Sequence, residues 1–241
     1  MSDTNKKFAA FDIDGTLFRG ALFRELIYDL LADGAVPNAL TKDFEEAERA
    51  WKTRQHVNAF HEYEEAMISS FDSSLVEVSF EAFEKAAIKV IDRVGDYVYA
   101  YTRDLAAALK KQGYTLIAIS GSPQELVEPF VAKYGFDIFV AQQYGRGDNG
   151  KFNGEVTKTH TGKDVILKKL IEEHGLSLEG SVAVGDTGGD IGMLSIVEKP
   201  IAFNPEKKLF EAAKENSWNI VVERKNMIYK LSQNEPTFVL A

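Results

Sequence analysis

Phe8-Ala-Ala-Phe-Asp-Ile-Asp-Gly-Thr-Leu17 is an apolar run that ends in two carboxylates and then in a turn. The residues from Phe8 to Phe11 predict a buried strand, and Asp12 and Asp14 follow it two positions apart. Residues two apart in a strand point to the same face, so the two charges would lie roughly side by side if the strand persists through Asp14. At about 4 Å and an effective dielectric constant near ~20, they repel by roughly 4 kcal/mol. Such a pair shares a proton or recruits a metal ion, which indicates a chemical role for this turn.

Short apolar runs recur along the rest of the chain, and amphipathic stretches separate them. The further predicted strands are 114–119, 136–140, 181–184, 200–203 and 220–222. The predicted helices between them are 101–112, 123–134, 163–174, 191–197 and 206–216. This alternation predicts an α/β fold with a doubly wound, parallel, Rossmann-like sheet.

The stretch after the first strand breaks this rhythm, because its apolar residues follow helical spacing, as in Leu22, Leu26 and Leu30. It predicts a helical cap domain, residues 18–95, inserted after the first strand. The α/β catalytic core would then comprise residues 1–17 and 96–241. Further along, residues 144–154 contain the pair Asn149-Gly150 and predict a β-hairpin.

Composition excludes several classes of function. The chain has 241 residues, a formal net charge of -9 and no cysteine, so disulfides, thiolate nucleophiles and sulfur-based zinc sites are ruled out. The acidic balance disfavours nucleic acid as a partner, because phosphate backbones bind clustered Lys and Arg. No apolar run is long enough for a membrane span, and residues 1–7 lack the apolar core of a signal peptide. We therefore expect a cytoplasmic protein without a membrane partner; the sequence does not indicate its oligomeric state.

A second polar cluster lies at the end of the strand predicted over 114–119. Ser120 and Gly121 fall between this strand and a helix N-terminus, where free N–H groups and the helix dipole favour a phosphate group. Ser122, Pro123 and Glu125 fit the N-cap, N1 and N3 positions of that helix. Ser120 is therefore expected to contact phosphate, and Ser122 to be a helix cap without a catalytic role.

A third cluster, the glycine-rich turn after Val184, carries Asp186 and Asp190. In open α/β sheets ligands bind beyond the carboxyl ends of the strands, which is where all three clusters fall. Asp190 could instead cap the helix that begins at Ile191. Four carboxylates around a phosphate dianion exceed the charge of one divalent cation, so a nearby ammonium group is expected, and Lys163 is the candidate.

The three clusters and Lys163, in their order along the chain, resemble the motifs of the haloacid dehalogenase superfamily. The helical insert resembles the cap of its phosphoserine-phosphatase-like branch. The resemblance implies that Asp12 is the nucleophile and forms an aspartyl-phosphate. Asp14 would protonate the leaving oxygen and later deprotonate the hydrolytic water, and Ser120, Gly121 and Lys163 would bind the phosphoryl oxygens.

The resemblance also implies a Mg²⁺ cofactor. Its protein ligands would be carboxylate oxygens of Asp12 and Asp186 and the backbone carbonyl of Asp14, with Asp190 supporting the site. Mg²⁺ prefers oxygen ligands in octahedral geometry, which suits this set.

The expected activity is Mg²⁺-dependent hydrolysis of a small phosphorylated metabolite. The alternatives are a phosphomutase and a phosphate-binding relative without turnover. The chain departs from the phosphoserine phosphatases at two places: residues 18–21 offer no Glu to hold a substrate amino group, and Gly189 stands where Asn is usual. These two departures weaken the inference from the resemblance that phosphoserine is the substrate.

Overall fold

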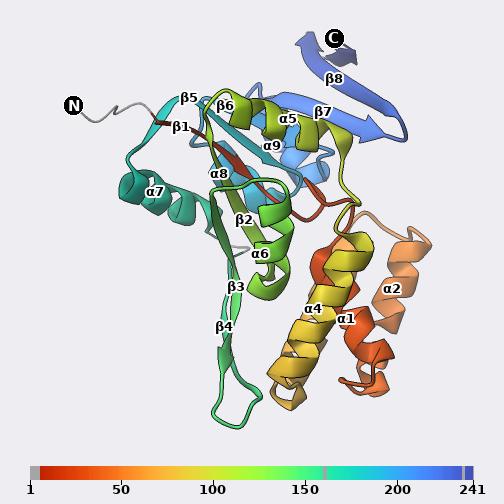
Figure 1. Ribbon diagram of the computed structural model, residues 1–241. Helices are drawn as coiled ribbons and strands as arrows, with labels where there is room; N and C mark the ends of the chain where they lie inside the picture. The colour runs from red at the N-terminus through yellow and green to blue at the C-terminus, as the bar shows by residue number, and fades with distance from the viewer. Residues whose placement is uncertain (1–5, 160–161, 235–236, 241) are drawn as a thin grey trace. The chain divides into compact units, whose positions relative to one another are not determined.

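The computed structural model describes residues 6–159, 162–234 and 237–240, which form two compact units (Figure 1). The first unit comprises Met1–Leu22, Arg93–Gln142 and Lys158–Ala241, and the second comprises Phe23–Asp92 and Gln143–Thr157. The second unit therefore begins and ends a few residues inside the predicted cap and also includes the segment from Gln143 to Thr157. That this unit acts as a cap domain stays a prediction.

The first unit is built on a mostly parallel sheet. Its strands are β1 (Lys6–Phe11), β2 (Thr115–Pro123), β3 (Ile138–Arg146), β5 (Leu176–Gly185), β6 (Lys199–Phe203), β7 (Asn219–Arg224), β8 (Met227–Asn234) and β9 (Thr237–Leu240). They are ordered β3-β2-β1-β5-β6-β7-β8-β9. Within the described residues, the neighbouring pairs from β3 to β7 are parallel, and the pairs β7–β8 and β8–β9 are antiparallel. This order confirms the predicted doubly wound α/β fold, to which β8 and β9 add an edge that the sequence did not indicate.

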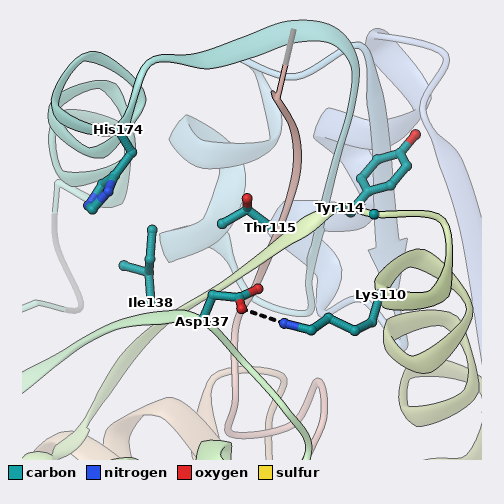
Figure 2. Close-up of a pocket in the computed structure, with 7 residues that line it drawn as sticks. Lys110, Tyr114, Thr115, Asp137, Ile138 and His174 are labelled. Carbon is teal, nitrogen blue, oxygen red and sulfur yellow. Dashed lines mark hydrogen bonds and ion pairs between the residues drawn. The ribbon is translucent and has the colours of Figure 1, made fainter. Parts of the chain in front are cut away.

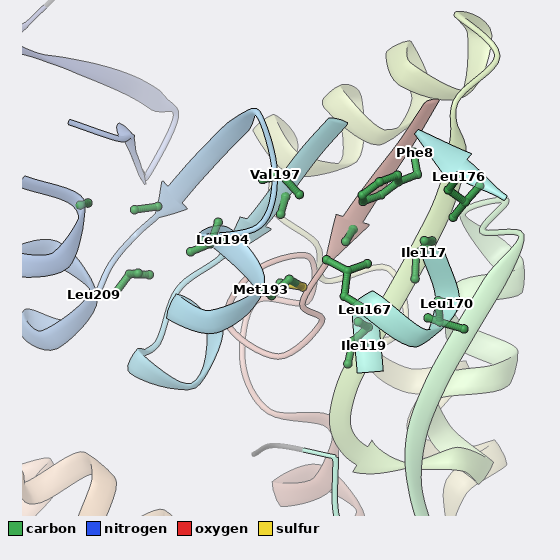
Figure 3. Packing of buried hydrophobic residues seen from close by; sticks show 14 of the residues in the cluster. Phe8, Ile117, Ile119, Leu167, Leu170, Leu176, Met193, Leu194, Val197 and Leu209 are labelled. Carbon is green, nitrogen blue, oxygen red and sulfur yellow. The ribbon is translucent and has the colours of Figure 1, made fainter. Parts of the chain in front are cut away.

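Helices cover both faces of this sheet. They are α5 (Ala100–Lys111), α6 (Gln124–Lys133), α7 (Lys163–His174), the turn η3 (Gly188–Asp190), α8 (Ile191–Leu194) and α9 (Lys207–Glu215). Phe8 and Ala10 of β1 pack with residues of α7, α8 and α9 (Figure 3), and Ala9 and Phe11 pack with residues of α5 on the other face. Successive strand residues point to opposite faces, so the uninterrupted apolar run of β1 is what a central strand requires.

The second unit is largely helical, as predicted. Its elements are α1 (Leu22–Ala32), η1 (Asn38–Asp43), α2 (Glu45–Lys52), α3 (Ala59–Ser74), η2 (Leu75–Glu77), α4 (Phe80–Val94) and β4 (Phe152–Thr157), together with the end of β3. β3 and β4 form the predicted hairpin. The Tyr144 ring lies 5.9 Å from those of Phe83 and Phe152 and 6.5 Å from that of Phe71, so the hairpin shares an aromatic core with α3 and α4.

Candidate active site

The candidate residues of the first unit lie where three neighbouring strands end. β1 pairs in parallel with β2 on one side and with β5 on the other. Asp12 directly follows β1, Ser120 lies near the end of β2, and Asp186 directly follows β5. The strand order runs one way from β1 to β3 and the other way from β5 to β7, and such reversal points are where open α/β sheets bind ligands.

Three carboxylates and one ammonium group meet at this edge. One carboxylate oxygen from each of Asp12, Asp186 and Asp190 lies within 4.8 Å of the others. Lys163 Nζ lies 2.5 Å from Asp12 Oδ1 and 2.7 Å from Asp190 Oδ1, and the lysine is only 5% exposed. The structure thus brings together residues that are up to 178 positions apart in the sequence, from Asp12 to Asp190 (190 − 12).

Burial dominates the electrostatics of this cluster. Desolvation raises the pKa of Asp12 to about 7, and the charge of Lys163 only partly opposes it. Burial, followed by the charges of Asp12 and Asp190, also raises the pKa of Asp186. For Lys163, burial disfavours the charge, but the two carboxylates outweigh it and raise the pKa. Buried oxygen donors whose negative charge exceeds that of the one ammonium group fit a divalent cation such as Mg²⁺.

Gly15 allows Asp186 to approach the turn after β1. Its φ is +80°, and a Cβ atom at this position would lie 2.0 Å from Asp186 Oδ2. The next residue, Thr16, donates a hydrogen bond of 2.9 Å from its hydroxyl to Asp186 Oδ1. The turn that follows Asp14 therefore positions the Asp186 carboxylate, and only glycine leaves room for it.

The side chain of Asp14 has different partners. Its Oδ1 accepts the Leu22 N–H at 2.6 Å, and its Oδ2 accepts the hydroxyls of Ser122 at 2.7 Å and Ser120 at 3.1 Å. Burial raises the pKa of Asp14 despite these donors. Asp14 is thus held as a separate carboxyl group beside the cluster, bonded to groups of β2 and to the backbone at the start of α1.

The prediction that Ser122 caps a helix is wrong. β2 continues to Pro123, α6 begins at Gln124, and the N-cap residue Pro123 has no side chain that could accept a hydrogen bond. Because the strand persists, Ser122 points to the same side as Ser120, two residues earlier, and both reach Asp14. Gly121 lies between these two serines.

The side chain of Asp190 does not cap the helix that begins at Ile191, which was one of the two alternatives that the sequence left open. Its Oδ2 accepts the backbone N–H groups of Asp186 at 3.1 Å and Thr187 at 3.0 Å, which closes the turn η3 rather than capping α8. Its Oδ1 accepts Lys163. The same residue therefore fixes the turn that carries Asp186 and orients the lysine.

Two buried threonines that the sequence did not indicate support the site. The Thr102 hydroxyl donates to the carbonyl of Thr16 at 2.8 Å, and the Thr159 hydroxyl donates to the carbonyl of Ser120. Both hydroxyls bond backbone atoms across long sequence separations, and a single sequence carries no signal for such contacts.

A hollow of about 490 Å³ lies away from this cluster (Figure 2). Thr115 and Ile138 in its lining begin β2 and β3, so it lies at the amino ends of the strands. Lys110 and Asp137 form an ion pair within it. The candidate residues lie at the opposite, carboxyl ends, so we do not assign the chemistry to this hollow.

The family follows from comparison with known proteins. Residues 9–195 match the family model of the haloacid dehalogenase-like hydrolases, and the chain belongs to this family. A phosphoserine phosphatase of Methanocaldococcus jannaschii is 27% identical over 228 residues, which cover 93% of this chain and 96% of that protein. These findings confirm the predicted superfamily and its phosphoserine-phosphatase-like branch.

Other relatives differ in name and in coverage. A histidinol-phosphatase of Neisseria meningitidis is 22% identical over 90% of this chain and 98% of its own length. An "inhibition of morphological differentiation protein" of Streptomyces azureus is 31% identical over 55% of this chain, and the match spans half of that protein.

Solved structures share the fold. The phospho-aspartyl intermediate analogue of a phosphoserine phosphatase has a TM-score of 0.63 at 23% identity, covering 92% of this chain and 95% of that one. A protein of unknown function from Bordetella pertussis Tohama I has a TM-score of 0.69 at 18% identity, covering 90% and 98%. Separately, no helix within the described residues is both long and apolar enough to cross a bilayer.

Proposed function

We propose that this chain is a Mg²⁺-dependent phosphomonoester hydrolase that acts on a small phosphorylated metabolite through an aspartyl-phosphate at Asp12. The observation that carries the proposal is the cluster in which Lys163 bonds both Asp12 and Asp190. A carboxylate oxygen of Asp186 lies within 4.8 Å of carboxylate oxygens of these two residues. A family match and two full-length relatives named as phosphatases support it.

In the first step an oxygen of Asp12 attacks phosphorus. The new bond joins this oxygen to phosphorus, the ester P–O bond breaks, and the leaving oxygen takes a proton from Asp14. Lys163 Nζ holds the Asp12 carboxylate at 2.5 Å and would also neutralise negative charge on the phosphoryl oxygens. Ser120 and Gly121 would orient these oxygens through hydrogen bonds. Phosphoryl transfer depends mainly on such positioning and charge stabilisation.

In the second step Asp14 takes a proton from a water molecule, which attacks the phosphorus of the aspartyl-phosphate. The bond between Asp12 and phosphorus breaks, inorganic phosphate leaves, and both carboxyl groups return to their starting states. Burial raises the pKa of Asp14, which favours the protonated form that the first step requires.

The metal would be held by carboxylate oxygens of Asp12 and Asp186 and by the carbonyl of Asp14, with Asp190 supporting the site. When bound, Mg²⁺ supplies positive charge that stabilises the transferring phosphoryl group. The three clustered carboxylates outnumber the one ammonium group that bonds two of them, which is why we assign a cation here.

The substrate class is a monoester of a small metabolite. The two full-length relatives are named for different substrates, and residues 18–21 lack the acidic group expected for phosphoserine. We therefore expect other metabolite phosphates to be better substrates than phosphoserine. A cytoplasmic location and the absence of a nucleic-acid partner stay predictions.

A panel of phosphorylated metabolites tests this function. We expect release of inorganic phosphate from at least one of them with Mg²⁺, loss of release with chelator, and recovery when Mg²⁺ is restored. Isomerisation of a sugar phosphate faster than phosphate release would indicate a mutase instead. Tight phosphate binding without turnover on any compound would contradict catalysis.

A further inference from the structure

Ser122 makes the shorter of the two hydroxyl contacts to Asp14. Its Oγ lies 2.7 Å from Asp14 Oδ2, compared with 3.1 Å for Ser120 Oγ. Ser122 is 2% exposed, so water does not readily replace its hydroxyl. The Ser122 backbone N–H also donates to Ser120 Oγ at 3.0 Å, which ties the two serines together.

The two oxygens of Asp14 face different kinds of donor. Oδ1 accepts a backbone N–H, which can only donate, at 2.6 Å. Oδ2 faces two hydroxyls, each of which can donate or accept. Oδ2 is therefore the oxygen that can carry or release a proton while keeping a hydrogen-bond partner.

Ser120 has a second task in the proposed reaction, because its hydroxyl is also assigned to the phosphoryl group. When substrate is bound and Ser120 donates to a phosphoryl oxygen, Asp14 Oδ2 keeps only one of its two hydroxyl partners. That partner is Ser122.

We propose that Ser122 is a positioning residue that holds Asp14 Oδ2 in the orientation for proton transfer to the leaving oxygen. This inference rests on the proposed function. As the P–O bond breaks, the proton moves from Asp14 Oδ2 to the leaving oxygen, and the Ser122 hydroxyl donates to the carboxylate that remains. Ser122 does not touch the substrate in this role.

The reaction's dependence on the leaving group tests the proposal. Phenyl phosphate and 4-nitrophenyl phosphate have similar shapes, but nitrophenolate leaves readily without a proton, whereas phenolate depends more on the acid. We expect Ser122→Ala to lower kcat/KM for phenyl phosphate by about tenfold and for 4-nitrophenyl phosphate by no more than about threefold. The constant kcat/KM is used because it reports the steps up to the first phosphoryl transfer.

Two comparisons separate positioning from packing. Ser122→Thr and Ser122→Val add nearly the same bulk, but only threonine keeps the hydroxyl. We therefore expect the ratio of kcat/KM for phenyl phosphate to kcat/KM for 4-nitrophenyl phosphate to match that of the unaltered chain in the threonine variant alone. Ser181 is also a buried serine, but its hydroxyl bonds backbone atoms of Leu178 and Glu198. Any loss of kcat/KM in Ser181→Ala should therefore be the same for both esters.

The role of Ser122 would be overturned if Ser122→Ala lowered kcat/KM equally for both esters. It would also be overturned if the threonine and valine variants had the same ratio of kcat/KM values for the two esters. Either result would leave the phosphatase proposal intact. Failure of the proposed function would show differently, as an unaltered chain that hydrolyses neither ester with Mg²⁺.

Discussion

At the scale of single residues, the site depends on positions where one residue type alone fits, either because it lacks a side chain or because it carries a particular charge. Gly15 is the clearest case, since any side chain there would meet Asp186 Oδ2 at 2.0 Å, in addition to the cost of φ +80°. Lys163 is the second case, because its ammonium group is the positive charge that bonds both Asp12 and Asp190.

Gly15→Ala should displace the Asp186 carboxylate and weaken Mg²⁺ binding by at least about tenfold, which corresponds to ~1.4 kcal/mol. Isothermal titration of the purified variant with Mg²⁺ measures this affinity. Gly135→Ala is the matched control, because Gly135 has φ +73° but open space where its Cβ would be. Equal Mg²⁺ affinities in the two variants would rule out the steric argument.

Lys163→Met should abolish turnover and destabilise the metal-free protein by about 3–5 kcal/mol, the usual cost of breaking a buried ion pair. Mg²⁺ should recover part of this loss, because it replaces positive charge among the carboxylates. Urea unfolding with and without Mg²⁺ gives both values. Lys168→Met is the control, because Lys168 is an exposed lysine that pairs with Asp164 one helical turn earlier. We expect its free energy of unfolding to change by less than about 1 kcal/mol. If, in the absence of Mg²⁺, the Lys163 variant were as stable as the unaltered chain, the claim that Lys163 offsets the charge of the buried carboxylates would be contradicted.

The candidate carboxylates were selected from the sequence because runs of apolar residues followed by Asp mark strand ends, and Lys163 was selected because gathered carboxylates need a positive charge. The structure brings Lys163 and three of the carboxylates together, and their roles stay predictions. Sequence reasoning failed at Ser122. The residues Ser122, Pro123 and Glu125 fit a helix start, but β2 persists to Pro123 and turns the serine toward Asp14. A local helix signal could not show that a carboxylate 108 residues earlier would be the partner.

At the scale of elements, the hairpin of β3 and β4 was predicted from its Asn-Gly turn, but its packing was not. Besides the aromatic contacts of Tyr144, Phe80 N–H donates to the carbonyl of Gly150 at 3.0 Å, and Arg146 pairs with Glu84 of α4 at 2.8 Å. These contacts join segments more than 60 residues apart in the sequence. The strands β8 and β9 were not predicted; their continuous apolar runs, 227–229 and 238–240, are only three residues long.

Tyr144→Ala should destabilise the helices of the second unit as well as the hairpin, by about 3–4 kcal/mol for the loss of a buried aromatic ring. Amide hydrogen exchange in α3 and α4 measures the effect on the helices. Tyr97, which is 59% exposed, provides the control substitution to alanine. Loss of protection confined to residues 143–157 would show that the hairpin does not stabilise the helices.

At the scale of the whole molecule, the order of the strands explains why distant carboxylates meet. β1 lies between β2 and β5, so the groups that follow these strands emerge at one edge of the sheet. The alternation of strands and helices was enough to predict a doubly wound sheet with the polar clusters at its strand ends, which the structure confirms, but the order of the strands was not predicted. The substrate could not be predicted in the same way, because its recognition depends on side-chain geometry that no strand pattern encodes.

Because the folded chain gathers the carboxylates and the unfolded chain separates them, Mg²⁺ should stabilise the native state. At a Mg²⁺ concentration about 100 times the dissociation constant, linkage predicts a gain of ~2.7 kcal/mol in the free energy of unfolding. Thermal unfolding in Mg²⁺ and in chelator measures it, with Asp186→Asn as the variant expected to lose most of the gain. An identical gain in that variant would place the ion elsewhere.

The central claim is that Asp12 becomes covalently phosphorylated during turnover, and acid-quenched reactions followed by peptide mass spectrometry test it most directly. We predict one added phosphoryl group on Asp12, in a peptide released by pepsin at acid pH, while substrate is being turned over with Mg²⁺, and none in Asp12→Asn, which should also be inactive. Phosphate release by purified Asp12→Asn at the rate of the unaltered chain, or a phosphoryl group trapped on another residue, would contradict the account.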